Sequence, residues 1–220
     1  MSFKTITLHG HGPSPNPWKV AFILEELGLP YEWKYSDNKQ IKEEPFLSIN
    51  PNGRLPAIED PNTGITLWES GAILEYLVET YDKEHKISFE HGSKDNFFAK
   101  QWLHFQMSGQ GPYFGQLSWF LRFHSEKIQS AIDRYTNEIR RVSGVLDGVL
   151  KKHEYLVADK FSYVDVAFLP WFDTVPYFTD AIDFETDFPS LYTWLEKVRA
   201  RPGIAKLREQ RAESVAAVRK

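Results

Sequence analysis

Glu69 and Ser70 are the residues in this chain whose types and positions best fit binding of a small charged ligand. They directly precede an apolar run that predicts a helix, so the Ser70 hydroxyl and the first helical N–H groups would hold an anion. The Glu69 carboxylate would hold a cation. An ordinary capped helix is the competing interpretation. Together with the backbone at Leu55-Pro56, the pair fits a zwitterion with an adjacent amide, such as a small peptide.

A second candidate ligand contact is the pair Leu55-Pro56, which precedes the apolar residues Ala57 and Ile58. This pattern predicts a loop that enters a strand with a cis Leu55–Pro56 bond, because X–Pro bonds have only a small trans preference. The backbone N–H and C=O before the proline would then face outward, where a ligand could bond to them. An ordinary strand entry is the competing interpretation.

The composition excludes several kinds of site and partner. The chain has no cysteine, which excludes a disulfide framework, a thiolate metal site and a protein thiol nucleophile. Sulfur chemistry would therefore have to arrive with a ligand. With 26 basic and 30 acidic residues, the net charge of −4 does not favour a nucleic-acid partner. No metal spacing such as His-x-x-x-His occurs, so we expect no metal and interpret His104 and His124 as structural.

The apolar runs are all too short to cross a membrane, and the N-terminus lacks the pattern of a secretory signal. We therefore expect a cytoplasmic protein that has no membrane partner.

The first 82 residues predict a small α/β domain with a mixed sheet. Alternating residues and aromatic residues predict strands, and repeats at helical spacing predict helices. The resulting order is βαβ followed by ββα. The predicted elements are a strand at 4–9, a helix at 17–27, strands at 31–35, 57–59 and 65–67, and a helix at 70–81.

Residues 83–93 are polar and predict a linker, and residues 94–220 predict an all-helical domain. An aromatic helical face in this region is interrupted at 109–112. A long amphipathic helix is expected near 128–149, followed by a helix that begins with a capping box at Ser162 and Asp165. A last helix is expected from 189 to 201, ending at Pro202-Gly203.

Several motifs together resemble the fungal nitrogen-regulator-like (Ure-type) glutathione transferases and the related bacterial Nu-class enzymes. The resemblance covers almost the whole chain. It implies a thioredoxin-like N-terminal domain, a helical C-terminal domain, glutathione as co-substrate and a homodimer. The motifs are Ser14-Pro15-Asn16, Trp68-Glu69-Ser70-Gly71-Ala72-Ile73-Leu74, the segments 106–116 and 123–125, and Ala131-Ile132-Asp133-Arg134-Tyr135.

The resemblance also implies roles for individual residues. Asn16, and secondarily Ser14, would stabilise the glutathione thiolate by hydrogen bonding, although either could simply cap a helix. Leu55 would bind the cysteinyl backbone, and Glu69 and Ser70 the γ-glutamyl group. Further contacts are expected from Arg54 to the glycyl carboxylate, from Gln40 or Lys42 in the preceding loop, and from Arg134 to the glutathione of the neighbouring subunit.

For the second substrate, we expect an electrophile pocket lined by aromatic residues of the helical domain. These are Phe114, Trp119, Phe123 and Trp171, each of which could instead be core or dimer contact. The expected function is that of a glutathione transferase active in detoxification, or of a glutathione-dependent disulfide reductase. The alternative is a non-catalytic glutathione-binding regulator or ligand carrier of the same fold.

Overall fold

A computed structural model describes residues 2–218, and their contacts form two compact units. The first unit contains the chain up to Ser88 together with the residues from Arg199 onward, and the second is Phe89–Val198. The domain boundaries given above, 1–82 and 94–220, remain predictions.

The first unit is built on a four-stranded mixed sheet in the order β2-β1-β3-β4. β1 runs parallel to β2 and antiparallel to β3, and β3 runs antiparallel to β4. The predicted α/β unit with a mixed sheet is thereby confirmed. The strands are β1 (Ile6–Gly10), β2 (Tyr31–Tyr35), β3 (Ala57–Asp60) and β4 (Ile65–Trp68).

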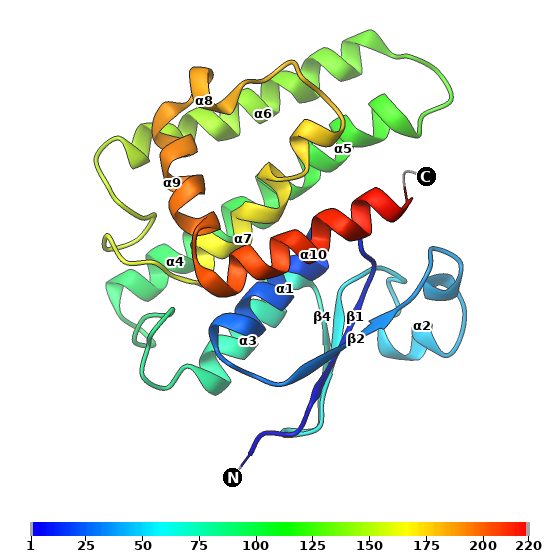
Figure 1. The fold of residues 1–220 in the computed structure, drawn as a ribbon, viewed down its shortest axis with the longest axis vertical. Coiled ribbons are helices and arrows are strands. Elements are labelled where there is room, and N and C mark those ends of the chain that lie inside the picture. Colours follow the sequence, from blue (N-terminus) through cyan, green and yellow to red (C-terminus); the bar gives the residue numbers. More distant parts are fainter. Residues whose placement is uncertain (1, 219–220) are drawn as a thin grey trace. The chain divides into compact units, whose positions relative to one another are not determined.

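Two helices pack together on one side of this sheet: α1 (Pro15–Glu26) and α3 (Ser70–Tyr81). The short segments η1 (Gln40–Lys42) and α2 (Phe46–Ile49) lie on the other side (Figure 1). α1 begins with Pro15 and Pro17, because a proline in the first turn loses no helical hydrogen bond there. It ends just before Gly28, whose φ of 64° suits glycine.

The C-terminal helix is α10 (Pro202–Val218), which lies along α1 (Figure 1). The prediction that the last helix stops at Pro202-Gly203 was therefore wrong. α9 (Pro189–Arg199) does end there, but the proline that ends one helix is also well suited to the first turn of the next. Lys206 of α10 pairs with Glu25 of α1, and Arg201, just before α10, pairs with Glu26, so both ion pairs hold α10 against α1.

The second unit is helical, as predicted. Its first three segments follow one another without interruption: α4 (Lys94–Phe105), a π-helical turn η2 (Gln106–Gln110) and α5 (Gly111–Arg122). The predicted interruption at 109–112 was wrong, because Pro112 lies in the first turn of α5, where a proline is tolerated. The remaining helices are α6 (Gln129–Leu150), α7 (Tyr163–Phe172), η3 (Val175–Tyr177), α8 (Phe184–Asp187) and most of α9.

α7 is buried along its whole length and forms the centre of the second unit. Its predicted capping box is confirmed: the Ser162 side chain accepts from the Asp165 N–H, and the Asp165 carboxylate accepts from Ser162 N at 2.8 Å. Ser162 Oγ also donates to Asp165 Oδ2 at 3.0 Å. Asp165 also accepts hydrogen bonds from Trp194 Nε1 and Leu156 N. The local signal that starts the helix therefore also connects it to α9.

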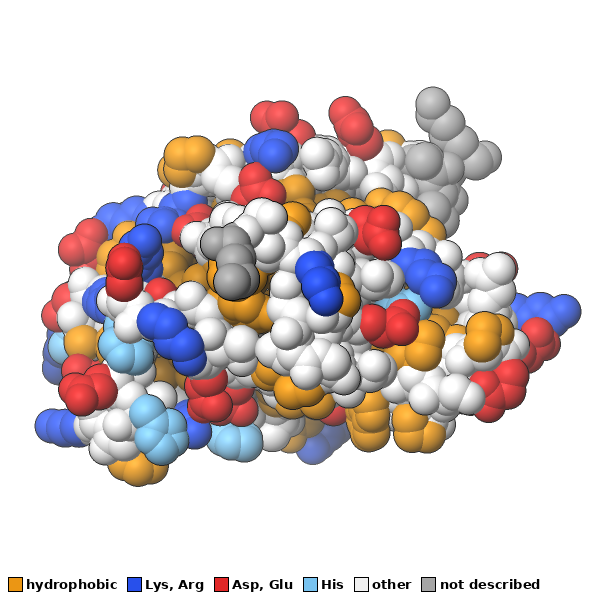
Figure 2. All heavy atoms as spheres, turned by 90° about the horizontal axis from the view of Figure 1, so that it is seen from below, with side chains coloured by type: hydrophobic (Ala, Val, Ile, Leu, Met, Phe, Trp, Pro, Cys, Tyr) orange, Lys and Arg blue, Asp and Glu red, His pale blue; other side chains and the backbone are white. Residues whose placement is uncertain are grey.

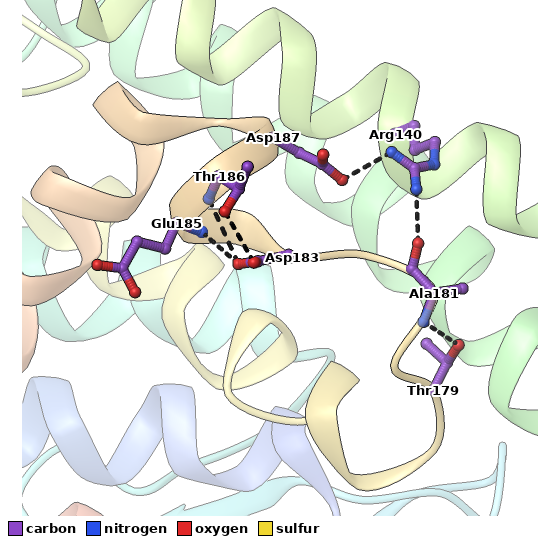
Figure 3. Close-up of polar contacts among 7 residues, drawn as sticks. All are labelled: Arg140, Thr179, Ala181, Asp183, Glu185, Thr186 and Asp187. Atoms are coloured by element: carbon purple, nitrogen blue, oxygen red, sulfur yellow. Dashed lines mark hydrogen bonds and ion pairs between the residues drawn. The ribbon is translucent and has the colours of Figure 1, made fainter.

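After α7 the chain follows an irregular path that α6 holds in place (Figure 3). Arg140 of α6 pairs with Asp187 at 2.8 Å and donates to the carbonyl oxygen of Ala181. Asp183 caps the short helix α8. One arginine thus ties together both ends of the segment 181–187.

The face drawn in Figure 2 has acidic and basic side chains interspersed with apolar ones. Among the residues that the structure describes, no helix has the length and apolar character needed to span a membrane.

Candidate functional site

The strand register brings three chain segments to one edge of the sheet. His9 lies opposite Ala57 in the antiparallel pair β1–β3, and Ala57 lies opposite Trp68 in the antiparallel pair β3–β4. The residues that follow β1, precede β3 and follow β4 therefore leave the sheet at the same edge. These residues include the start of α1, Leu55-Pro56 and Glu69-Ser70.

The loop before β3 is held by its own hydrogen bonds. The Leu55–Pro56 bond is cis, as predicted, and so is Glu44–Pro45. Asn50 Nδ2 donates to the carbonyl oxygen of Arg54 at 2.7 Å. Gly53 has a φ of 59°, and a Cβ there would lie 2.7 Å from the carbonyl oxygen of Ile41, so the loop requires glycine. The backbone at Leu55 therefore occupies a fixed position.

Glu69 has the most informative backbone conformation in the first unit. It precedes α3 with φ 72° and ψ 115°, a region that residues other than glycine rarely adopt. Its side chain is exposed, whereas that of the adjacent Ser70 is 2% exposed. A strained backbone conformation of this kind persists only where the surrounding structure maintains it, and such residues are concentrated at ligand-binding and active sites.

At the start of α1, Ser14 and Asn16 are both half-buried. Ser14 occupies the N-cap position with extended backbone, yet its side chain makes no capping hydrogen bond. The neighbouring Pro15 and Pro17 have no N–H, so few backbone donors remain in the first turn. The side chains of Ser14 and Asn16 are consequently the main polar groups that this helix start offers.

Lys19 is a residue that the sequence analysis missed. It is 1% exposed on α1, and its Nζ lies 3.3 Å from Ser70 Oγ. Burial lowers the pKa of Lys19 to about 7, and the charge of Glu69 opposes that shift. The sequence did contain a signal for it, since this lysine stands between Trp18 and Val20 in an apolar helical run that predicts burial. Lysine is almost never fully buried unless it is paired, so a buried lysine implies a partner.

The other predicted glutathione contacts in this unit are Arg54, Gln40 and Lys42, and only some of them lie at the loop before β3. Arg54 is an exposed residue of the loop before β3, and Lys42 Nζ donates to the carbonyl oxygen of Gly53 in the same loop at 2.5 Å. Gln40 lines a cavity of about 380 Å³ with His9 and Phe46. The lining of this cavity includes neither Leu55-Pro56 nor Glu69-Ser70. Of the alternatives Gln40 and Lys42, Lys42 is the one connected to that loop.

The predicted aromatic residues form two pairs in the second unit. Phe114 and Trp171 are buried, with ring centroids 6.4 Å apart. Trp119 and Phe123 are 51% and 66% exposed and stack at 5.8 Å. Arg134 is exposed on α6. Only the second pair offers large exposed aromatic surface.

The histidines have mainly structural contacts. His124 stacks on Phe120 and bonds to the backbone of Glu126, whereas His104 is exposed. Buried His9 contacts Glu59 through Nε2 at 2.7 Å and so connects β1 with β3. Among the described residues, no three acidic, histidine or cysteine side chains are grouped to hold a metal.

Comparison with known proteins agrees with this geometry. The family model described as glutathione S-transferase, N-terminal domain, matches residues 4–79, and the model of the C-terminal domain matches residues 97–202. The chain belongs to the glutathione S-transferase family. The four-stranded mixed sheet and the helical second unit are the fold of that family.

Within the glutathione S-transferase family the chain is similar to Ure-type proteins, which confirms the resemblance found in the sequence. It is 50% identical to the glutathione S-transferase-like protein tpcF of Aspergillus fumigatus, covering 91% of this chain and 93% of that one. The transferase URE2P6 of Phanerochaete chrysosporium, solved with oxidized glutathione, matches with a TM-score of 0.93, 47% identity and coverage of 96% and 98%. The transcriptional regulator URE2 of Saccharomyces cerevisiae is 34% identical over 91% of this chain and 66% of its own length.

Proposed function

We propose that this protein is a glutathione-dependent enzyme that binds glutathione at the sheet edge and uses its thiolate against a second substrate. With an electrophile, the sulfur forms a bond to carbon and the leaving group departs with its electron pair. With a disulfide, the thiolate attacks one sulfur, the S–S bond breaks and the other sulfur leaves as a thiolate. A second glutathione thiolate then attacks the glutathionyl sulfur of the resulting mixed disulfide, whose S–S bond breaks as the remaining substrate sulfur leaves as a thiolate. Glutathione disulfide is the product, so the reductase reaction uses two glutathione molecules.

The proposed roles follow the chemistry of the side chains. Asn16 contributes an amide donor and Ser14 a hydroxyl, both of which stabilise the thiolate and lower its pKa. An asparagine side chain cannot take up a proton, so Asn16 stabilises the thiolate and does not act as a general base. Leu55 offers backbone bonds to the cysteinyl part of glutathione, while Glu69 and Ser70 bind the γ-glutamyl ammonium and carboxylate.

The observation that carries this proposal is the convergence of the α1 start, Leu55-Pro56 and Glu69-Ser70 at one sheet edge. The strained backbone at Glu69 supports a ligand at the same place. The complex of URE2P6 with oxidized glutathione lends support from a similar protein. Further ligand contacts are proposed for Arg54, Gln40 or Lys42, Arg134 and the aromatic pocket residues. The homodimer, the detoxification role and the cytoplasmic location are also proposals.

The second candidate function is a glutathione-binding regulator without turnover. Its support is the similarity to the transcriptional regulator URE2. Both functions require glutathione binding, so binding alone does not separate them. Turnover does separate them.

The test is to measure binding of reduced and oxidized glutathione by calorimetry, reduction of hydroxyethyl disulfide, and conjugation of chlorodinitrobenzene. Wild type, Asn16→Ala and the exposed control Asn137→Ala are compared. We expect turnover, stronger on the disulfide, and a loss of at least about tenfold in kcat for Asn16→Ala, since an electrostatic stabiliser is removed. The control should match wild type.

The pH profile adds a readout specific for the thiolate. For Asn16→Ala we expect the rise of kcat/KM to move to higher pH, because the thiolate loses a stabilising donor. Glutathione binding without turnover on either substrate would overturn the enzyme proposal in favour of the regulator. Absence of binding would overturn both.

A further inference from the structure

We propose that Lys19 is a positioning residue of the glutathione site, which donates to Ser70 Oγ and thereby turns the Ser70 hydroxyl proton toward the γ-glutamyl carboxylate. This inference rests on the proposed function, and it assigns a role to a side chain that does not itself touch the ligand. The relevant residues all lie in the first unit.

The geometry supports a specific contact. Lys19 Nζ and Ser70 Oγ are 3.3 Å apart, and the two side chains are 1% and 2% exposed. Lys19 comes from the second turn of α1 and Ser70 from the first residue of α3, and these two helices pack against each other. The hydroxyl of Ser70 therefore lies beside a buried cation and at the N-terminus of α3.

The contact fixes how Ser70 can meet a ligand. A hydroxyl has one donor proton and two acceptor lone pairs, whereas an ammonium can only donate. When Lys19 donates, Ser70 Oγ is the acceptor and its proton points away from Nζ. A nearby cation also polarises the O–H bond, which strengthens a hydrogen bond to a carboxylate.

Stability alone does not explain this lysine. Removing an ammonium from water is costly, and replacing a buried charge by a packed apolar side chain is often neutral or stabilising. α1 is otherwise apolar around this position, with Trp18 and Val20 fully or nearly fully buried. A buried ammonium beneath the anion-binding end of α3 has a clear role in binding, because a ligand carboxylate there favours the charged form.

The surrounding charges allow the protonation of Lys19 to be coupled to the ligand. Glu69, at the start of α3, favours the ammonium and is the charged group that acts on it. α10 also packs on α1, but its Lys206 pairs with Glu25, and Arg201, which precedes α10, pairs with Glu26. Its Arg211 is buried. His9 of β1 bonds to Glu59.

This coupling has a definite sign. Burial and Glu69 together leave the pKa of Lys19 at about 7 before a ligand binds. A bound carboxylate raises that pKa, so the complex holds a proton that the free protein loses at higher pH. Glutathione affinity should therefore be highest below about pH 7 and fall as the pH rises above it.

The experiment measures the affinity for S-methylglutathione, which has no titrating thiol, by calorimetry from about pH 6 to about pH 8.5. The variants are Lys19→Met, Lys19→Arg and the exposed control Lys39→Met. For Lys19→Met we expect a loss of about tenfold at pH 6.5 and a flatter pH dependence than that of wild type. Lys19→Arg should recover much of the affinity, and the control should match wild type.

Steady-state kinetics separate positioning from catalysis. For Lys19→Met we expect KM for glutathione to rise while kcat at saturation changes little, since the interaction binds substrate and transition state alike. In a Ser70→Ala background, Lys19→Met should have little further effect, because Lys19 acts through Ser70. Ser70→Ala alone should also flatten the pH dependence, which tests the inference even if Lys19→Met does not fold.

Two results would overturn the inference. Folded Lys19→Met with wild-type affinity and pH dependence would make Lys19 only a structural link between α1 and α3, with the proposed function intact. Equal effects of Lys19→Met in the wild-type and Ser70→Ala backgrounds would exclude action through Ser70. If wild type binds neither glutathione nor S-methylglutathione, the proposed function fails as well.

Discussion

Gln110 donates through Nε2 to the carbonyl oxygen of Phe168, 3.1 Å away, and accepts from Gln106 Nε2 at 2.9 Å. Both glutamine side chains are fully buried, and they lie in the π-helical turn that joins α4 to α5. The hydrogen bonds connect this turn to the central helix α7. π-Helical turns are frequent at functional sites, and here the turn keeps a Gly-rich segment helical.

Gln110→Leu should lower the free energy of unfolding by about 2 to 3 kcal/mol, because it leaves the buried amide of Gln106 without this acceptor. The double variant Gln106→Leu/Gln110→Leu should lose less than the sum of the two single variants, since both partners are then apolar. Urea unfolding of the four proteins measures the coupling. Additive losses would contradict a direct interaction.

Glu69→Gly should leave the free energy of unfolding unchanged or raise it by up to about 1 kcal/mol. Relief of the positive φ offsets the greater flexibility of glycine in the unfolded chain. Glutathione affinity should fall at least about tenfold, and Glu69→Gln should show a similar loss because the carboxylate is removed. Denaturation and calorimetry of both variants provide the measurement.

Glu79→Gly, in the exposed last turns of α3, is the matched control. It should lose up to about 1 kcal/mol of stability, as glycine does in a helix. Its glutathione affinity should stay at the wild-type value. Equal destabilisation at both positions would show that Glu69 stores no strain.

The stability of wild type relative to Lys19→Met should rise with pH. The ordinary lysine pKa of 10.5 applies to the unfolded chain, whereas burial lowers the pKa in the folded protein to about 7. Between these values the unfolded chain holds a proton that the folded protein lacks, so the free energy of unfolding increases with pH. Between about pH 7.5 and about pH 9 the gain should be on the order of 2 kcal/mol.

Urea unfolding at several pH values measures this difference, with Lys19→Arg as the reference that stays charged. Lys19→Arg should show no such gain, because arginine does not deprotonate in this range. A flat difference between wild type and Lys19→Met would mean that Lys19 keeps an ordinary pKa in the folded protein.

Asp165→Ala should lower the free energy of unfolding by about 3 kcal/mol or more. It removes the capping box and leaves buried donors from Ser162, Trp194 and Leu156 without their acceptor. The exposed Asp180→Ala should stay within about 0.5 kcal/mol of wild type. Thermal and urea unfolding measure both, and equal losses would contradict a special role for Asp165.

The sequence by itself determined the features that depend on neighbouring residues. The apolar spacing around 70–81 and 128–149 predicted α3 and α6, and Ser162 with Asp165 predicted the start of α7. Leu55-Pro56 predicted a cis bond. Each signal lies within a few residues along the chain, where spacing, capping and proline geometry act directly.

Only the tertiary structure decided the features that depend on distant parts of the chain. Pro202 follows the end of α9, and only the packing of α10 on α1 decided that a further helix begins at this proline. Phe114 became core while Trp119 stayed exposed, although both are aromatic residues of one helix. Lys19 is buried against Ser70, 51 positions away, because α1 packs on α3. Burial and charge come from packing between remote segments, which no local pattern contains.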